Sequence, residues 1–478
     1  MEERERCMKW PADFWTRTCR LMGEEACRDL CEALQHDTPV SVRVNRAKLS
    51  DVPVGARRVP WCETGYYLPE RPTFTFDPLF HAGGYYVQEA SSMFLEQALR
   101  RYVERPVALL DLCAAPGGKS TLARSVLPEG SLVVSNEVMR NRSQVLAENL
   151  VKWGNAAVVV TNNDPVEFGR SGPLFDVLVA DVPCSGEGMF RKDEGAVAEW
   201  SVENVTLCWQ RQRRILRDSW PCLKPGGLLV YSTCTFNREE NEDNVAWMVR
   251  ELGAEVLPVP VEADWAVTGN LAGTDFPVYR FLPHRTEGEG LFMAVLRKTG
   301  EAGEAVPCDD GGSRKAAKRP KGGKQGPAEE VPKELQSWLE RPEAYVFERN
   351  GTVASAFPAA WQALGQCLKS RFRVLHAGVE LGEWKGRDWQ PHPSLALSTS
   401  LRTDRFPFVE LTYEQAVAFL RKEAVTLAPS VPRGYVLVGF RGQPLGFAKN
   451  IGNRANNLYP NEWRIRSGYL PETLRMVF

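Results

Sequence analysis

Two cysteines stand where their thiols could attack an electrophilic ring. Cys184 follows a proline in residues 181–188, and Cys234 follows a threonine in residues 231–236. Each comes at the end of a hydrophobic run, beside residues that are typical of turns. A thiol attacks only as the thiolate, and an unperturbed cysteine has a pKa of about 8.5, so both thiols need an electropositive setting. The pair therefore suggests covalent chemistry.

A glycine-bearing loop at residues 111–120 precedes both thiols. Its end, residues 118–120, matches the tail of a phosphate-binding P-loop. However, Cys113 stands where that motif has its leading glycine, and Pro116 removes a backbone N–H that would hold a phosphate. The glycines also suit the close approach of the backbone to an adenosyl cofactor. We favour this interpretation over a P-loop and over a simple tight turn.

Two acidic residues further along the chain fit such a cofactor. Glu137 ends the next apolar run, nineteen residues after Gly118, where a carboxylate can accept hydrogen bonds from both ribose hydroxyls. Asp164 follows the third run and could accept a hydrogen bond from the adenine amino group. Lys119 and a sulfonium cofactor would supply the positive charge that the thiols need.

The elements around these residues predict an α/β fold. Short β-branched runs alternate with segments of helical length, and the runs cover residues 108–113, 131–136, 156–161, 175–180 and 227–231. This alternation is typical of a doubly wound, parallel sheet, which binds its ligands at the carboxyl ends of the strands. Six residues fall at or just past those ends, namely Cys113, Glu137, Asp164, Asp181, Cys184 and Cys234. We expect residues 225–227 to form a turn into the last of these strands.

The rest of the chain suggests further domains. A length of 478 residues exceeds what one core normally serves. We expect a small mixed domain at 1–100, a core at 101–298, a flexible linker at 299–330 with a basic cluster at 314–321, and a helix-then-β region at 331–478. The net charge of -1 excludes a general attraction to polyanions, so a nucleic acid would be held by local basic patches.

The cysteine pattern points to a reducing compartment. The twelve cysteines form no Cys-x-x-Cys pair and the chain starts with charged residues, so we expect free thiols and a cytoplasmic protein. No apolar run approaches the roughly 20 residues that cross a bilayer, so we expect no membrane association. A zinc site built from Cys113, Cys184, Cys234 and a histidine lacks paired spacing, so we expect no metal. The nine other cysteines are expected to be buried as small hydrophobic residues, namely Cys7, Cys19, Cys27, Cys31, Cys62, Cys208, Cys222, Cys308 and Cys367.

Residues 111–121, 181–188 and 232–236, together with residues 80–93, resemble the RNA cytosine-5 methyltransferases of the Nol/Nop/Sun type. Two segments of the C-terminal part, residues 375–385 and 446–450, resemble the RsmF-like branch, which modifies small-subunit ribosomal RNA and ends in a PUA-like β-barrel. The resemblance implies a class I (Rossmann-like) methyltransferase core, a small α+β N-terminal domain and a C-terminal β-rich, PUA-like, RNA-binding region.

The resemblance also implies S-adenosylmethionine as cofactor. It is expected to be held by Cys113, Ala114, Ala115, Pro116, Gly117, Gly118, Lys119, Glu137, Asp164 and Asp181. Of these, Asp164 lies in the loosest match to the family pattern.

The same resemblance implies distinct roles for the two thiols. Cys234 is expected to add to carbon 6 of cytosine, and Cys184 is expected to assist the later release of the product. Asp181 could hydrogen-bond the cytosine edge, with Lys119 orienting these groups, although a structural ion pair between Asp181 and Lys119 is the alternative. The base has to leave its stack to reach the crevice, so the substrate would be a loop or a single strand.

We therefore expect an enzyme that forms 5-methylcytosine in RNA, with small-subunit ribosomal RNA or the small ribosomal subunit as partner, acting as a monomer. One alternative is a non-catalytic RNA-binding assembly factor that retains the fold, and another is the same chemistry on tRNA. Near the amino terminus, residues 43–46 resemble the RNA-side extension of the family. In the C-terminal region, six residues could either grip RNA or, for the tryptophans, simply pack: Trp384, Lys385, Arg387, Trp389, Lys449 and Arg454.

Overall fold

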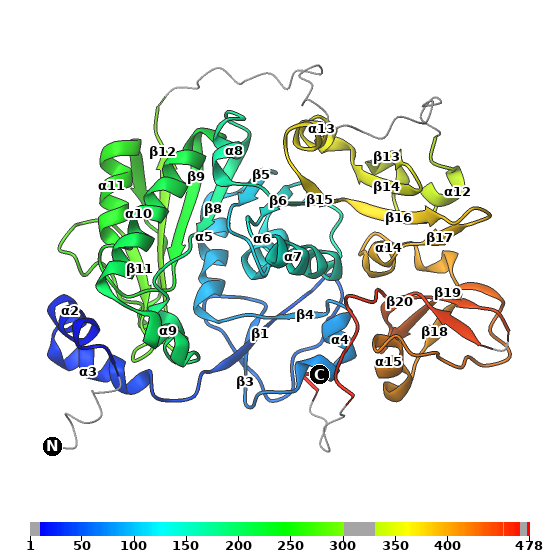
Figure 1. Cartoon of the computed structure of the whole chain (residues 1–478), viewed down its shortest axis with the longest axis horizontal. Coiled ribbons are helices and arrows are strands. Elements are labelled where there is room, and N and C mark those ends of the chain that lie inside the picture. Colours follow the sequence, from blue (N-terminus) through cyan, green and yellow to red (C-terminus); the bar gives the residue numbers. More distant parts are fainter. Residues whose placement is uncertain (1–9, 301–329, 453, 469–475) are drawn as a thin grey trace.

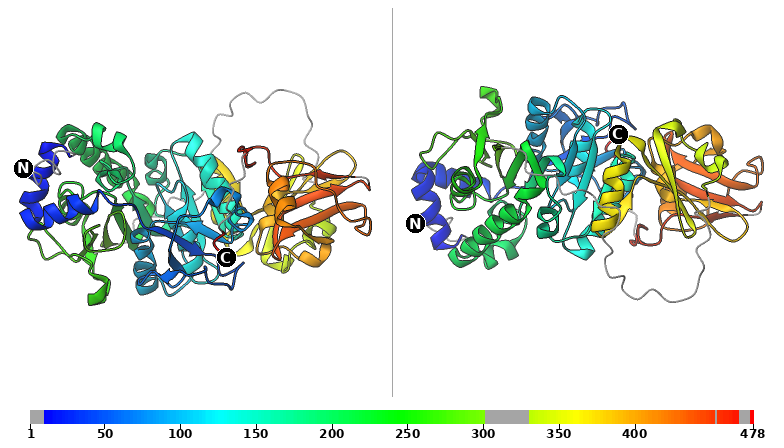
Figure 2. Two further views of the ribbon diagram at one scale, coloured as in Figure 1. Left: turned by 90° about the horizontal axis from the view of Figure 1, so that it is seen from below. Right: turned by 90° about the horizontal axis from the view of Figure 1, so that it is seen from above.

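The computed structural model describes residues 10–300, 330–452, 454–468 and 476–478. The predicted basic cluster at 314–321, Cys7 and Cys308 lie outside these residues. The molecule is elongated, with the N-terminal helices at one end and the C-terminal sheets at the other (Figures 1 and 2).

The N-terminal section combines helices with a small antiparallel sheet of strand order β2-β3-β1-β4. Its elements are α2 (Ala12–Met22), α3 (Glu24–Ala33), β1 (Val40–Val44), β2 (Arg57–Arg58), β3 (Gly65–Leu68), α4 (Pro78–His81) and β4 (Tyr85–Val87). Gly23 separates α2 from α3. Its φ of 89° lies in the left-handed region that favours glycine and interrupts the helix. The predicted α+β character of this section is confirmed.

The core contains the predicted doubly wound sheet. Its elements are α5 (Leu95–Tyr102), β5 (Ala108–Asp111), α6 (Gly118–Val126), β6 (Leu132–Asn136), α7 (Arg140–Trp153), β7 (Val158–Thr161), α8 (Pro165–Gly169), β8 (Phe175–Asp181), α9 (Glu194–Glu199), α10 (Val202–Ser219), β9 (Leu223–Thr233), α11 (Glu242–Leu252), β10 (Ala254–Leu257), β11 (Val278–Phe281) and β12 (Leu291–Lys298). The strand order is β10-β12-β9-β8-β5-β6-β7-β15. Strands β7, β6, β5, β8 and β9 run parallel, so their carboxyl ends meet at one edge.

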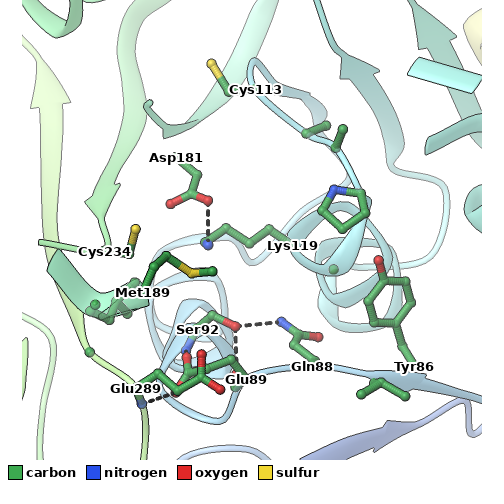
Figure 3. A pocket seen from close by; sticks show the side chains of 18 of the residues that line it. Tyr86, Gln88, Glu89, Ser92, Cys113, Lys119, Asp181, Met189, Cys234 and Glu289 are labelled. Carbon is green, nitrogen blue, oxygen red and sulfur yellow. Dashed lines mark hydrogen bonds and ion pairs between the residues drawn. The ribbon is translucent and has the colours of Figure 1, made fainter. Parts of the chain in front are cut away.

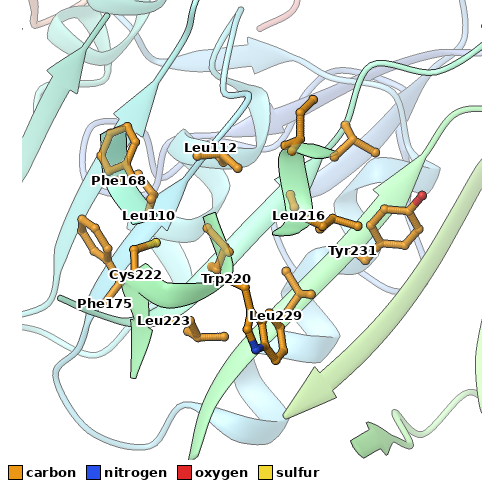
Figure 4. Packing of buried hydrophobic residues seen from close by; sticks show 14 of the residues in the cluster. Leu110, Leu112, Phe168, Phe175, Leu216, Trp220, Cys222, Leu223, Leu229 and Tyr231 are labelled. Atoms are coloured by element: carbon orange, nitrogen blue, oxygen red, sulfur yellow. The ribbon is translucent and has the colours of Figure 1, made fainter. Parts of the chain in front are cut away.

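Both faces of this sheet are covered, which explains why its strands are continuously apolar. One face packs against α8, α10 and α11, with Leu110, Leu223 and Leu229 among the buried residues (Figure 4). The opposite face packs against α5 and α6. The predicted turn at residues 225–227 instead lies within β9 as an irregularity, where the pairing with β8 shifts its register and Gly226 has a φ of 73°.

The C-terminal section forms two four-stranded sheets, of strand order β13-β14-β16-β17 and β18-β19-β20-β21. Its elements are α12 (Lys333–Gln336), β13 (Tyr345–Asn350), β14 (Val353–Pro358), α13 (Gln362–Arg371), β15 (Val374–Ala377), β16 (Val379–Trp384), β17 (Trp389–Pro391), α14 (Pro393–Leu397), β18 (Phe408–Glu410), α15 (Tyr413–Leu420), β19 (Gly434–Phe440), β20 (Gln443–Asn450) and β21 (Ala455–Asn457). The β-rich character predicted for this section is present.

One strand of the C-terminal section joins the core sheet. Strand β15 pairs antiparallel with β7 at the sheet edge. Just before it, the ring of Phe372 stacks on Phe168 of α8 with centroids 4.4 Å apart, and the backbone of Arg373 is hydrogen-bonded to Asn162 and Asn163. The C-terminal section thus contacts the loop that follows β7.

The N- and C-terminal sections also share a hydrophobic cluster. It includes Val42 and Val44 of β1, Phe419 of α15, Val438 of β19 and Val477. Segments far apart in the sequence therefore pack together beneath the core, and the end of the chain lies beside α4 (Figure 1).

The motif at residues 43–46 is mostly buried against the core and forms little of an RNA surface. Arg43 is completely buried, donates to Gln88 Oε1 at 2.8 Å and to Thr121 Oγ1 at 2.5 Å, and lies over the ring of Trp153. Asn45 is also buried, whereas Arg46 is exposed. Arg43 therefore ties β1 to the cofactor-loop helix α6, and Asn45 donates to the carbonyl oxygen of Trp153 at the end of α7.

The cysteines mostly behave as predicted. Those buried are Cys27, Cys31, Cys62, Cys208, Cys222 and Cys367, while Cys19 is half-buried. The expectation of free thiols is wrong at Cys367, which is disulfide-bonded, and holds at the other described cysteines. Among the described residues, no helix combines the length and the apolar character needed to cross a membrane.

Candidate active site

A cavity of about 330 Å³ opens at the carboxyl edge of the core sheet, between the loops that follow β5, β8 and β9. Figure 3 shows its main side chains. It is lined by Tyr86, Val87, Gln88, Glu89, Ser92, Asp111, Cys113, Ala114, Ala115, Pro116, Gly118, Lys119, Asp181, Gly188, Met189, Cys234, Glu289, Gly290 and Leu291. Its volume falls within the range of roughly 300–1,000 Å³ that is usual for small-molecule sites.

The loop between β5 and α6 forms one wall of the cavity. Gly117 has a φ of 118°, which disfavours a side chain, and a Cβ at that position would lie 3.3 Å from Leu146 Cδ1. Helix α6 begins at Gly118, so its positive N-terminal end points toward the loop. The loop therefore offers backbone N–H groups at close approach.

Asp111 stands at the end of β5, beneath this loop. Its Oδ2 accepts a hydrogen bond from Ser120 Oγ at 2.6 Å, whereas its buried Oδ1 has no partner within the described part of the chain. Burial raises the pKa of Asp111 to about 7. A ligand that donates a hydrogen bond or carries a positive charge would satisfy this orphaned oxygen.

Lys119 and Asp181 form an ion pair across the cavity, with Nζ and Oδ2 2.9 Å apart (Figure 3). Ser232 Oγ donates to Asp181 Oδ1 at 2.7 Å and so fixes the carboxylate. Burial lowers the pKa of Lys119, but Asp181, Asp111 and Cys234 together raise it above its usual value. The lysine is therefore a permanent positive charge beside the thiol of Cys234.

The two predicted thiols are in contact. The sulfurs of Cys184 and Cys234 are 3.0 Å apart, and both residues are half-buried free cysteines. Cys234 lines the cavity beside Lys119 and Asp181, whereas Cys184 does not. The pKa of Cys184 is raised well above its usual value by the hydrogen bond to Cys234, by burial and by the charges of Cys234 and Glu240.

Three predicted cofactor residues do not line this cavity. Gly117 lies in the loop but does not contribute to the lining of the cavity. Glu137 is buried at the end of β6, where its Oε1 accepts from the backbone N–H of Met139 and its Oε2 lies 3.5 Å from Arg142. Asp164 is exposed and caps the N-terminus of α8. The remaining predicted cofactor residues, Cys113 to Pro116, Gly118, Lys119 and Asp181, are brought together.

Sequence reasoning missed the wall opposite the cofactor loop. Tyr86 belongs to β4 and Gln88, Glu89 and Ser92 to the segment after it, while Met189 and Glu289 come from the loops after β8 and β11. The carboxylate of Glu89 accepts from the backbone N–H groups of Ser91, Ser92 and Glu289, which fastens the β11–β12 loop to the N-terminal segment. The match of residues 80–93 to the family was a signal for the first group, whereas Glu289 and Met189 stand in no recognisable pattern.

The predicted RNA-contacting residues of the C-terminal region lie mostly on the β16–β17 hairpin. Trp384 pairs with Trp389 across the two strands, with ring centroids 5.6 Å apart. Lys449 pairs with Asp388 at 2.8 Å. Lys385 and Arg387 are exposed at the hairpin tip, and Arg454 is exposed beside β21. No cluster of three or more metal-ligating side chains occurs among the residues that the structure describes.

Comparison with known proteins agrees with this architecture. The sequence profile of the 16S rRNA methyltransferase RsmB/F family matches residues 102–297, that of the N-terminal domain of 16S rRNA methyltransferase RsmF matches residues 10–90, and that of the methyltransferase RsmF PUA domain matches residues 406–465. Ribosomal RNA small subunit methyltransferase F of Citrobacter koseri is 33% identical over 464 residues, which cover 92% of this chain and 93% of that protein. Its counterpart in Shigella boydii is 32% identical with the same coverage.

Solved structures resemble somewhat less than two thirds of the chain. A methyltransferase homolog from Pyrococcus horikoshii is 28% identical with a TM-score of 0.54, covering 62% of this chain and 99% of its own. NSun6 from the same organism, crystallised with SFG, has a TM-score of 0.52 at 20% identity, covers 61% of this chain and 99% of its own, and shares the fold.

The fold and the cavity at its strand ends define a class I methyltransferase that uses S-adenosylmethionine. The expected Rossmann-like core, small N-terminal domain and PUA-like region are thereby confirmed, as is the cofactor. The chain belongs to the 16S rRNA methyltransferase RsmB/F family and carries the N-terminal and PUA domains of its RsmF members. The domain boundaries that we predicted stay predictions.

Proposed function

We propose that this protein methylates carbon 5 of cytosine in the RNA of the small ribosomal subunit, through a covalent adduct between Cys234 and carbon 6. Its partner is ribosomal RNA or the small subunit itself, and we expect it to act as a monomer in the cytoplasm. The relatives named ribosomal RNA small subunit methyltransferase F support the substrate, because they match along nearly the whole chain.

The cavity suits the cofactor. S-adenosylmethionine supplies the methyl group from its sulfonium when bound. The loop at residues 113–118 would hold it through backbone N–H groups, and the orphaned Oδ1 of Asp111 would accept from its ammonium group. Glu137 and Asp164 do not line the cavity, so their assignment rests on their family positions.

Cys234 is the nucleophile in this proposal. It lies at the cavity surface, where Lys119 places a positive charge near its sulfur. Addition of the thiolate to carbon 6 moves the ring electrons toward carbon 5, which then accepts the methyl group. Asp181 and Lys119 hold the polar edge of the base and stabilise the charge that develops on it.

Cys184 assists release. In the resting state its hydrogen bond to Cys234 keeps the proton on Cys184. Once Cys234 is bonded to carbon 6, that bond is lost, so the pKa of Cys184 falls and its proton can pass to water. The thiolate of Cys184 then takes the proton from carbon 5, the carbon 5–carbon 6 double bond re-forms, and the electron pair of the carbon–sulfur bond returns to Cys234.

The observation that carries the proposal is the contact of two thiols of which one, Cys234, opens into the cofactor cavity beside an ion pair. The test is to incubate the protein with methyl-labelled cofactor and, separately, naked 16S rRNA, 30S subunits and tRNA, with Cys234→Ala as control. We expect label in 5-methylcytidine after digestion of the ribosomal substrates, and none with the variant.

The other outcomes separate the alternatives. Label that enters tRNA alone would replace the substrate but keep the chemistry. Cofactor binding without any transfer would favour a non-catalytic assembly factor. Label in a nucleoside other than 5-methylcytidine would contradict the roles of both thiols.

A further inference from the structure

Glu240 lies behind the thiol pair, on the turn that precedes α11, and is completely buried. Its Oε2 accepts hydrogen bonds from the backbone N–H of Ser185 at 3.0 Å and from Gln212 Nε2 at 2.6 Å, and its Oε1 accepts from Asn237 Nδ2 at 2.7 Å. All three partners of this carboxylate, one backbone N–H and two side-chain amides, are donors, so the site suits an ionised carboxylate. Because Ser185 directly follows Cys184, Glu240 holds the backbone that carries this thiol.

A second carboxylate makes the converse contact. Glu187 belongs to the Cys184 loop, and its Oε2 accepts from the backbone N–H groups of Phe236 at 2.6 Å and Asn237 at 2.9 Å, just past the other thiol. The N–H of Gly188 also donates to the carbonyl oxygen of Cys234 at 2.7 Å. Each thiol loop therefore holds the backbone of the other, and this reciprocal arrangement keeps the two sulfurs in contact.

The two sides of the thiol pair differ in charge. Burial and the neighbouring Glu187 raise the pKa of Glu240 to about 7, so its carboxylate carries a negative charge above that pH. Glu240 interacts electrostatically with Glu187, Cys184, Cys208 and Tyr231, while the cations Arg211 and Arg213 of α10 act on Cys208 and Tyr231. On the opposite side, Lys119 places a positive charge near Cys234.

We propose that Glu240 is a positioning residue that assigns the two thiols their roles. It fixes Cys184 against Cys234 through the backbone N–H of Ser185, and its carboxylate on the Cys184 side favours the protonated form of that thiol. This inference rests on the proposed function for the meaning of the roles, whereas its physical content concerns the free protein. Glu240 touches neither substrate nor cofactor and acts only through Cys184.

The test is site-resolved alkylation of the full-length protein with iodoacetamide under reducing conditions, without RNA or cofactor. Rates at Cys184 and Cys234 are measured by mass spectrometry from pH 6 to 10, and the pH dependence is compared, because absolute rates also reflect access. In Glu240→Gln, which keeps the size but removes the charge, we expect the apparent pKa of Cys184 to fall by about one pH unit or more. An unchanged pH profile at Cys184 would overturn the proposal.

The matched control is Glu187→Gln, which removes the other buried carboxylate and disturbs the loops on the Cys234 side. We expect it to lower the melting temperature without an equal fall in the apparent pKa of Cys184. An equal fall in both variants would show a general loosening of the loops, and the proposal would then be wrong.

A conservative variant guards against a misfolded Glu240→Gln protein. Glu240→Asp keeps the charge with a shorter reach, so Cys184 should keep a high apparent pKa while turnover falls through slower release. If Glu240→Asp lowers that pKa as far as a neutral residue would, charge is not the cause and the proposal fails. Since the alkylation readouts do not depend on methyl transfer, a protein that methylates no cytosine would refute the proposed function and leave the alkylation result standing.

Discussion

The two sides of the thiol pair show how the same residue type is prepared for different chemistry. On one side, Cys234 faces an open cavity with the ion pair of Lys119 and Asp181. On the other side, Cys184 faces a closed polar network around the buried carboxylate of Glu240. The cavity can admit a substrate, whereas the closed network fixes the backbone beside Cys184 and places a negative charge near this thiol.

The difference teaches that reactivity here comes from neighbours more than from position. Both thiols stand at the carboxyl ends of adjacent parallel strands, and their sulfurs are 3.0 Å apart. A nearby cation stabilises a thiolate, and a nearby carboxylate with burial stabilises the thiol. Changes at Cys234, Lys119, Asp111 and Ser232 should test this asymmetry with successively smaller effects.

The largest effect should come from Cys234→Ala. Without the nucleophile the adduct at carbon 6 cannot form, so methyl transfer should fall by roughly 10⁴-fold or more while RNA affinity changes little. The measurement is single-turnover transfer with saturating cofactor. Transfer within about tenfold of the unaltered protein would break the comparison outright.

Lys119→Met should come next, because it removes the charge beside Cys234 and keeps a similar length. We expect transfer to fall by roughly 10²- to 10³-fold, as for the loss of one group that stabilises developing charge. Lys224→Met is the control: its Nζ pairs with Asp176 at the same 2.9 Å, but at the opposite ends of β8 and β9. That partly exposed pair should contribute at most about 1 kcal/mol to stability and nothing to transfer. Equal losses in both variants would contradict a local role for Lys119.

The cavity side should also respond to pH through Asp111. Its pKa of about 7 means that the carboxylate is charged above pH 7 and protonated below it. Affinity for S-adenosylhomocysteine should therefore fall about tenfold from pH 8 to pH 6 as the partner of the ammonium is neutralised. Methylthioadenosine, which lacks the ammonium, should bind equally at both values in calorimetry. A pH-independent affinity for S-adenosylhomocysteine would exclude Asp111 as that partner.

The smallest effect should come from Ser232→Ala, which removes the hydrogen bond that fixes Asp181. A net loss of about 0.5–1.5 kcal/mol corresponds to a roughly two- to thirteenfold fall in kcat/KM. Ser219→Ala removes a buried hydroxyl that bonds to the Ile215 carbonyl inside α10, away from the cavity. It should alter only the melting temperature. A kinetic effect as large as that of Ser232→Ala would show that the loss at Ser232 is not specific to the cavity.

Much of the core was predictable because its information is local. Alternating apolar runs and helical segments indicate a parallel sheet, and the ends of such runs locate Cys113, Asp181, Cys184 and Cys234. The fold class, the cofactor and the family followed from these ends and from their motifs.

The rest depended on contacts that no local pattern encodes. The pairing of β15 with β7 joins residues more than 200 positions apart in the chain, and the sequence of β15 does not name its partner. The wall with Glu289 depends on where a loop closes over the site. Strand-end positions also do not distinguish the two thiols. The access of Cys234 to the cavity and the network behind Cys184 depend on how the loops fold.

The most direct test of the division of roles compares the adducts of two variants. Cys184→Ala and Cys234→Ala are each incubated with ribosomal RNA and cofactor, denatured, and analysed for protein–RNA cross-links by peptide mapping. We predict that Cys184→Ala accumulates an adduct through Cys234 on a methylated base, because attack is intact and release is blocked, and that Cys234→Ala gives none. An adduct through Cys184 in the Cys234→Ala protein, with none in the other, would contradict the account.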